Sequence, residues 1–231
     1  MSRRPLPEVV FFDCDGVILE SAKIKSDAFA TLFADVPEHV DAIVALHERE
    51  GGISRYRKFE WIYRDLLDRP LDTDESAALG ARYSEIVLDD LLRCPLVPGV
   101  VPCLEALAES ICVVVSGSPH DELVHVLEQR GLVQHFSHVF GAPHEKAPSM
   151  AEVLADRQVS ASRAVMIGDA ESDLRAAAAL RLPFIGRVPA GERSPFPPAT
   201  TTLADLTQLV DILLNSRIPP AAPGLESLRE R

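Results

Sequence analysis

The sequence is poor in cysteine and in positive charge, and both shortages exclude classes of protein. Its four cysteines, at positions 14, 94, 103 and 112 of 231, show neither CxxC spacing nor histidine partners. A structural zinc site is therefore not expected. We expect the protein to occupy a reducing compartment. Acidic residues outnumber basic residues by 35 to 23, for a net charge of -12. This balance argues against nucleic acid or an anionic membrane surface as a partner.

Long apolar runs, internal repeats and long low-complexity segments are also missing. Arg3 and Arg4 are followed by Pro and Glu, not by the apolar segment of a signal peptide, and the apolar run at Val9 is far too short to span a membrane. We therefore expect a cytoplasmic protein. Hydrophobic residues make up 47% of the chain, enough for a substantial core in one ordinary domain plus an insertion.

The most informative motif is Asp13-Cys14-Asp15-Gly16, which follows the apolar run Val9–Phe12. A strand that is apolar on both faces is buried between layers, and ligands bind beyond the carboxyl ends of such strands. Side chains alternate along an extended chain, so Asp13 and Asp15 point into one crevice, while Gly16 allows a sharp turn. Taken alone, such a motif is more often a solvated turn. Whether it is part of a catalytic site here depends on the other motifs of the chain.

Two more apolar runs end in polar clusters. Residues 111–115 lead into Ser116-Gly117-Ser118-Pro119, where backbone amides and a hydroxyl suit a phosphate oxygen, although Ser118 could simply cap a helix. Residues 164–167 lead into an acidic cluster, with Asp169 at the start of an expected helix and Asp173 one turn later. Converging carboxylate oxygens of this kind suit Mg²⁺. Lys146 lies between the two clusters, and by itself it is most often a surface charge.

In this order the four segments resemble the haloacid dehalogenase superfamily of phosphohydrolases over nearly the whole chain. Finer strings, such as Ser116–Pro119 and 183–188, are similar to the branch of phosphoglycolate phosphatase and β-phosphoglucomutase. Many relatives carry Lys-Pro-x-Pro, of which Lys146-Ala147-Pro148 keeps only part. The resemblance implies a nucleophilic Asp13 and an acid-base Asp15, and the second Asp argues against dehalogenase activity. A phosphatase of this kind forms an aspartyl-phosphate.

The resemblance also implies the remaining site residues. Mg²⁺ would be held by Asp13, the Asp15 carbonyl and Asp169. Ser116, the Gly117 amide and Lys146 would hold the phosphate oxygens. Asp173 would orient the metal waters or Lys146 instead of binding the metal directly.

The order of the predicted elements indicates an α/β fold, a doubly wound parallel sheet with a helical cap. Residues 17–96, here called the insertion, are helix-patterned throughout, with four amphipathic stripes that suit a small bundle. Residues 1–16 and 97–215 alternate between strand and helix patterns, including a last helix at 203–214, and predict the core domain. Residues 216–231 are expected to form a loosely held tail.

The position of the insertion, directly after the Asp pair, predicts a lid over the active crevice. Its segment Gly51–Lys58 contains two glycines and three cations. The resemblance implies Arg55 in this loop as a substrate contact, and Lys58 is a second candidate; the alternative is that these cations face solvent. Lys25 occupies a position where many relatives place a His, and we favour a surface role for it.

Two other functions remain open at this stage. A phosphomutase of the β-phosphoglucomutase type would use the same residues but return the phosphoryl group to a sugar. A receiver-type signalling domain is also an α/β protein phosphorylated on Asp, but it has no helical lid. We expect a small phosphorylated metabolite as the substrate, which the sequence does not identify, and a monomer or weak homodimer.

Overall fold

A parallel sheet forms the centre of the computed structural model, which describes residues 5–216 and 218–221. Within these residues the sheet has six strands in the order β3-β2-β1-β4-β5-β6. The strands are β1 (Val9–Phe12), β2 (Ile111–Pro119), β3 (His138–Ala142), β4 (Ala164–Gly168), β5 (Phe184–Arg187) and β6 (Thr201–Leu203). In the register, Phe11 of β1 lies between Val113 of β2 and Met166 of β4. The run Val9–Phe12 is apolar throughout because β1 is paired on both sides and covered on both faces.

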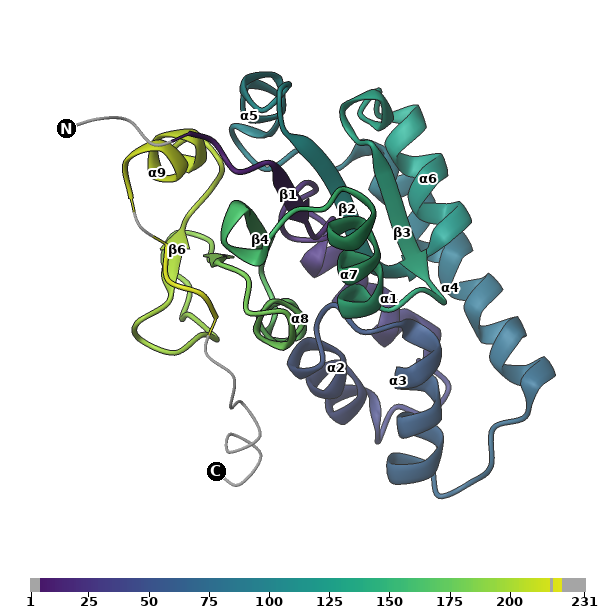
Figure 1. Ribbon diagram of the computed structural model, residues 1–231. Coiled ribbons are helices and arrows are strands. Elements are labelled where there is room, and N and C mark those ends of the chain that lie inside the picture. Colours follow the sequence, from purple (N-terminus) through teal and green to yellow (C-terminus); the bar gives the residue numbers. More distant parts are fainter. Residues whose placement is uncertain (1–4, 217, 222–231) are drawn as a thin grey trace.

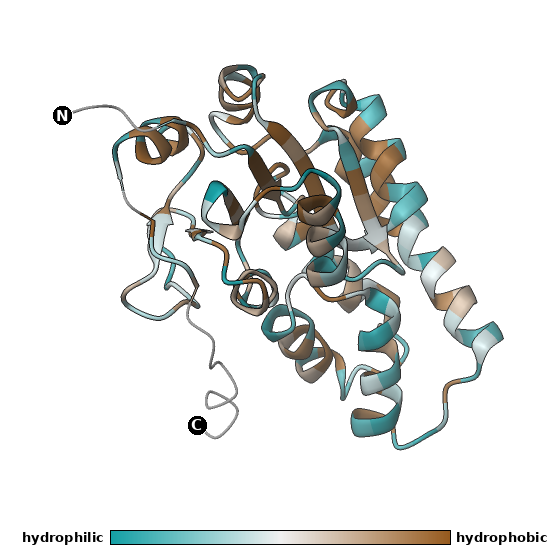
Figure 2. Cartoon of the chain, viewed as in Figure 1, coloured by the Kyte–Doolittle hydropathy of each residue, from teal (hydrophilic) through white to brown (hydrophobic). Residues whose placement is uncertain are grey.

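Helices cover both faces of this sheet. Val10 and Phe12 pack into one core cluster with α5 (Val100–Ala106), α6 (His120–Gln129) and α9 (Leu209–Asn215). Val9 and Phe11 pack into a second cluster with α7 (Lys146–Asp156) and α8 (Glu171–Ala179). The central strand β1 and the first part of β2 are accordingly brown, the hydrophobic end of the scale, in Figure 2. The predicted doubly wound α/β fold is confirmed.

The insertion folds into helices, as its periodicity predicts. They are α1 (Ala22–Leu32), α2 (Val40–Arg49), α3 (Arg55–Trp61), which continues as a π-helical turn η1 (Ile62–Leu66), and α4 (Thr73–Arg93). Phe29 lies at their centre, with its ring centroid 5.0 Å from that of Tyr83 and 5.9 Å from that of Phe59. The carboxyl end of β3 points toward these helices, and α4 runs alongside α6 (Figure 1). The insertion therefore lies at the edge of the sheet where the motif residues emerge.

The C-terminal part of the core differs from the prediction. The predicted last helix is present and packs on the core, but its predicted start at 203 is wrong, because residues Thr201–Leu203 form the edge strand β6 and the helix begins only at Leu209. The β-branched pair Thr201-Thr202 favours the strand. Between the two elements, the amide and hydroxyl of Thr207 both donate to Asp205 Oδ1, which closes a turn that a continuous helix could not contain.

Short elements complete the described part of the chain. The 3₁₀ turns η2 (Val133–His135) and η3 (Ala161–Arg163) precede β3 and β4. Of the predicted C-terminal tail, residues 217 and 222–231 lie outside the described residues. Ala221 is buried, and its amide donates to the Leu182 carbonyl at 2.8 Å. None of the described helices combines the length and the apolar character needed to cross a lipid bilayer.

Candidate active site

Three sequence motifs meet at one edge of the sheet, because they follow the neighbouring strands β2, β1 and β4. Asp13 is 1% exposed and lies directly after β1. Its amide donates to the Ile167 carbonyl of β4 at 2.9 Å, and its carboxylate accepts the Cys14 amide at 2.8 Å. The backbone of two strands thus fixes the position of this carboxylate.

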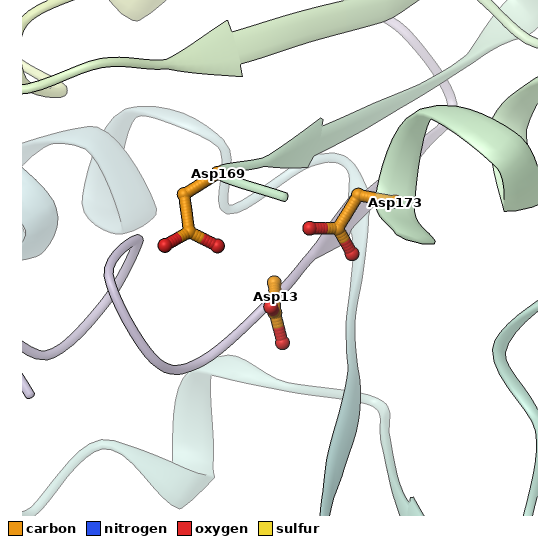
Figure 3. Close-up of side chains that lie close together, drawn as sticks. All are labelled: Asp13, Asp169 and Asp173. Carbon is orange, nitrogen blue, oxygen red and sulfur yellow. The ribbon is translucent and has the colours of Figure 1, made fainter. Parts of the chain in front are cut away.

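Three carboxylates converge beside β1. Oxygens of Asp13, Asp169 and Asp173 all lie within 4.8 Å of one another (Figure 3). Burial raises the pKa of Asp13 to about 7, although the Lys146 charge opposes the shift. Burial also raises the pKa of Asp169 well above its ordinary value, and the charge of Asp13 adds to this effect. Negatively charged carboxylates that are this close together and buried from solvent favour the binding of a cation or a proton between them.

Lys146 supplies part of the missing positive charge. It is the first residue of α7, and its Nζ lies 3.1 Å from Asp13 Oδ2 and 2.5 Å from Asp173 Oδ1. Burial opposes its charged form, but the two carboxylates outweigh this and raise the pKa of Lys146. The other oxygen of Asp173 accepts the Ala170 amide at the start of α8. Asp173 therefore has both oxygens engaged and holds Lys146 against Asp13.

Asp15 lies in a different environment from Asp13. Ser21 Oγ donates to one oxygen at 2.6 Å, while Lys25 Nζ and Ser118 Oγ donate to the other at 2.5 and 3.0 Å. Burial alone would raise the pKa of Asp15, but the Lys25 charge and the three hydrogen bonds outweigh it and lower that pKa. The pKa values of the two carboxylates in the motif are thus shifted in opposite directions, upward for Asp13 and downward for Asp15.

Two expectations from the sequence are wrong here. The surface role favoured for Lys25 fails, because its side chain is only 12% exposed and pairs with Asp15. The helix-cap alternative for Ser118 also fails, since α6 has Pro119 at its N-cap and the Ser118 hydroxyl instead contacts Asp15. Lys25 precedes Phe29 of the buried stripe by four residues. The helical period therefore places Lys25 on the same, inward face of the helix as Phe29.

The carboxyl end of β2 is covered by residues 51–54 of the insertion, here called the glycine loop. Ser116 is buried, and its Oγ accepts the Ser118 amide at 3.2 Å. A Cβ at Gly117 would lie 2.6 Å from the Gly52 carbonyl oxygen, so this close approach requires glycine. On the other side of the loop, Ser172 Oγ donates to the Gly51 carbonyl at 2.8 Å. The loop therefore lies between the starts of α6 and α8, above the acidic residues.

Arg55 reaches helix α6 and has an anionic partner there. Its guanidinium donates to Ser84 Oγ of α4 at 2.7 Å and to Glu122 Oε1 of α6 at 2.5 Å. The same group lies 4.3 Å from the centroid of the Tyr83 ring. Sequence reasoning missed Glu122, because a partner 67 residues away leaves no local signal.

Lys58, one turn further along α3, is 3% exposed. Its Nζ lies 3.0 Å from His47 Nδ1 and donates to the His47 carbonyl at 3.1 Å. Burial lowers the pKa of Lys58 to about 7, with the Lys25 charge adding to the shift. Burial likewise lowers the pKa of His47 to about 2, so its neutral ring offers an acceptor. Arg57, by contrast, is exposed.

These residues enclose a cavity of about 660 Å³ between the insertion and the sheet edge. Asp13, Asp15 and Asp169, which follow strands of the sheet, and Arg55 and Lys58 of α3 all contribute to its lining. The cavity lining thus includes most of the sequence-predicted residues: Asp13, Asp15, Arg55, Lys58, Gly117 and Asp169. Ser116, Lys146 and Asp173 are not part of the lining, although Lys146 contacts Asp13. The cavity is large enough for a small metabolite.

A family model described as haloacid dehalogenase-like hydrolase matches residues 7–181. A phosphoglycolate phosphatase of Rhodospirillum rubrum is 26% identical over 193 residues, which cover 78% of this chain and 79% of that protein.

Two solved structures share the fold. CbbY of Rhodobacter sphaeroides, in complex with xylulose-(1,5)bisphosphate, has a TM-score of 0.69 at 17% identity and covers 88% of this chain and 96% of its own. The hydrolase YfnB of Bacillus subtilis, bound to magnesium, has a TM-score of 0.67 at 18% identity. The match covers 90% of this chain and 99% of YfnB. With the family match extending over most of the chain, this protein is an enzyme of the haloacid dehalogenase-like hydrolase family.

Proposed function

We propose that this enzyme is a Mg²⁺-dependent phosphatase that hydrolyses a small phosphorylated metabolite through an aspartyl-phosphate on Asp13. The observation that carries the proposal is the convergence of Asp13, Asp169 and Lys146 beside a second carboxylate of the same motif, Asp15. In the substrate-free arrangement the pKa of Asp13 is raised and that of Asp15 is lowered by Lys25 and three hydrogen bonds. A bound cation would therefore have to keep Asp13 ionised, and the substrate would have to displace Lys25 from Asp15. The phosphatase name of the Rhodospirillum relative supports the same reaction.

The acidic residues fit a divalent cation. Asp13 and Asp169 offer hard oxygen atoms, and a Cβ at Gly16 would lie 2.0 Å from Asp169 Oδ2, so the glycine leaves room for that carboxylate. We assign Asp13, the Asp15 carbonyl and Asp169 as ligands, and Asp173 as the group that orients Lys146. Bound Mg²⁺ would offset the repulsion between the carboxylates and an incoming phosphate. The magnesium bound to YfnB supports this choice of metal.

In the first step a carboxylate oxygen of Asp13 attacks phosphorus, and the ester P–O bond breaks. Asp15 gives a proton to the departing alkoxide, which leaves as an alcohol. Ser116, the Gly117 amide and Lys146 are the proposed donors to the phosphoryl oxygens. Asp15 is ion-paired with Lys25 in the substrate-free arrangement. An incoming substrate therefore has to displace Lys25, so that Asp15 takes up a proton from solvent, which it then passes to the leaving alkoxide.

In the second step water attacks the aspartyl-phosphate, and Asp15 takes the proton of the water. The P–O bond to Asp13 breaks, inorganic phosphate leaves, and the Asp13 carboxylate is restored. We propose that the insertion, residues 17–96, acts as a lid domain over the core domain of residues 1–16 and 97–215. Its glycine loop, in contact with Gly117 and Ser172, would exclude bulk water during both steps.

Released phosphate from a panel of phosphorylated metabolites, with and without Mg²⁺, tests the proposal. We expect turnover that EDTA abolishes and Mg²⁺ restores, and Asp13→Asn should reduce it to background. The exposed Asp27→Asn serves as the matched control. Substantial turnover by Asp13→Asn would contradict the proposal. So would isomerisation of a sugar phosphate without release of free phosphate, which indicates a mutase.

A further inference from the structure

The cations that line the cavity differ in whether they have a counter-ion. Five lysine and arginine side chains contribute to its walls, and four of them pair with a carboxylate: Lys23 with Asp27, Lys25 with Asp15, Arg49 with Glu50, and Arg55 with Glu122. The ion pairs found among the described residues do not include the fifth, Lys58. It is also one of the most deeply buried of the five.

A buried ammonium without a counter-ion is costly, and such a group is retained where a ligand supplies the missing charge. The lowered pKa of Lys58 reflects this cost. Its contacts with the His47 ring and carbonyl fix the ammonium in place without neutralising it. A lysine ammonium has three N–H donors, and these contacts use two of them. The third has no partner among the described residues.

We propose that Lys58 binds a second anionic group of the substrate, a carboxylate or a second phosphate, at the end remote from the phosphate that is hydrolysed. The inference rests on the proposed phosphatase function and narrows its substrate class to phosphate esters with an additional negative charge. Lys58 lines the same cavity as Asp13 and Asp15, but it comes from α3 of the insertion, whereas the two carboxylates follow β1 of the sheet. Arg55 is less suited to this role, because Glu122 already neutralises its guanidinium.

The negative net charge of the protein also favours a binding role for Lys58. With a net charge of -12, the chain repels a multiply charged anion unless a local cation attracts it. Lys58 provides that attraction inside the cavity, where low polarity strengthens it. A phosphate ester without a second anionic group would leave the ammonium buried and unpaired, so the site discriminates against such an ester as well as favouring the doubly anionic substrate.

Matched substrate pairs test the proposal. In each pair a carboxylate is replaced by a hydroxymethyl group: 2-phosphoglycolate against 2-hydroxyethyl phosphate, and 6-phosphogluconate against sorbitol 6-phosphate. We expect the wild-type enzyme to prefer the carboxylate member of at least one pair, with a ratio of kcat/KM of roughly 10- to 150-fold, the range of one charged hydrogen bond. Lys58→Met should lower this ratio to near unity, mainly by raising KM for the carboxylate member. Arg57→Met, a change of the adjacent exposed cation, should keep the wild-type ratio.

The possible outcomes distinguish a failure of the Lys58 proposal from a failure of the phosphatase proposal. Hydrolysis of both members with equal efficiency by the wild-type enzyme would overturn the Lys58 inference and leave the phosphatase proposal standing. An equal loss on both members in Lys58→Met, with the ratio retained, would also overturn it and assign Lys58 a structural role at the C-terminal turn of α2. No phosphate release from any substrate by the wild-type enzyme would overturn the phosphatase proposal itself.

Discussion

Lys25 of α1 and Asp15 of the core motif form an ion pair with an N–O distance of 2.5 Å. The pair connects the insertion to the residue assigned as the acid and base. Ser118, at the end of β2, contacts both partners, with its hydroxyl 2.6 Å from Lys25 Nζ and 3.0 Å from Asp15 Oδ2. The position of the insertion and the protonation state of Asp15 are therefore coupled through one cluster of three side chains.

Removal of Lys25 should destabilise the protein, because Asp15 would lose its charged partner and keep only hydroxyl donors. In a double-mutant cycle of Lys25→Met and Asp15→Asn, we expect a coupling energy of about 1–3 kcal/mol, measured by urea unfolding. The control is Lys23→Met, since Lys23 is 83% exposed and its pair with Asp27 on the same helix should contribute less than about 0.5 kcal/mol. A coupling energy near zero would show that the Lys25–Asp15 contact is not maintained in solution.

A second prediction separates the roles of the two carboxylates. Asp15→Asn should slow hydrolysis of an alkyl phosphate by roughly 10²–10⁴-fold, because the leaving alkoxide loses its proton donor. Formation of the aspartyl-phosphate from p-nitrophenyl phosphate should suffer far less, since p-nitrophenolate leaves without a proton. The measurement is the burst of p-nitrophenol against steady-state turnover of the alkyl ester. Equal losses in both would mean that Asp15 does not protonate the leaving group.

The sequence predicted that Asp13, Ser116 and Asp169 would converge at one edge of the sheet, because each is placed by a buried strand. The apolar runs before Asp13, Ser116 and Asp169 indicate parallel strands, and such strands end at one edge of the sheet, so these side chains had to converge. Glu122 could not be found in this way, because an exposed-looking acidic residue in the first turn of a helix is common. Its role depends on how the insertion packs on α6, which no local pattern records. The edge strand β6 was missed for a related reason, since three residues provide too little periodicity.

The contact between Arg55 and Glu122 predicts a stabilising link between the insertion and the core. Their side chains are 4% and 9% exposed, so Arg55→Met or Glu122→Gln should each cost about 3–5 kcal/mol by leaving a buried group unpaired. The double variant should cost less than the sum of the two. The control is Arg57→Met, whose exposed pair with Glu60 should contribute at most about 1 kcal/mol. If Arg55→Met left stability unchanged and weakened only the best natural substrate, Arg55 would be a substrate contact instead.

The buried state of Lys58 predicts how stability depends on pH. Its pKa falls from 10.5 to about 7 in the folded protein. Below pH 7 both the folded and the unfolded states carry the proton, and the full cost of burying the charge is present. Between pH 7 and 10.5 only the unfolded state binds the proton, so the free energy of unfolding should rise with pH in this window. The rise should be a few kcal/mol, with a ceiling of about 5 kcal/mol.

Comparison with Lys58→Met isolates this contribution, because cysteine and tyrosine side chains also titrate at high pH. We expect the free energy of unfolding of the wild type, minus that of Lys58→Met, to increase between pH 7 and pH 10 in urea titrations. Arg57→Met should follow the wild type over the same range, since the Arg57 side chain is 62% exposed. A pH-independent difference between the wild type and Lys58→Met would show that Lys58 is not buried in solution. That result would also remove the physical basis for assigning it to the second anionic group of the substrate.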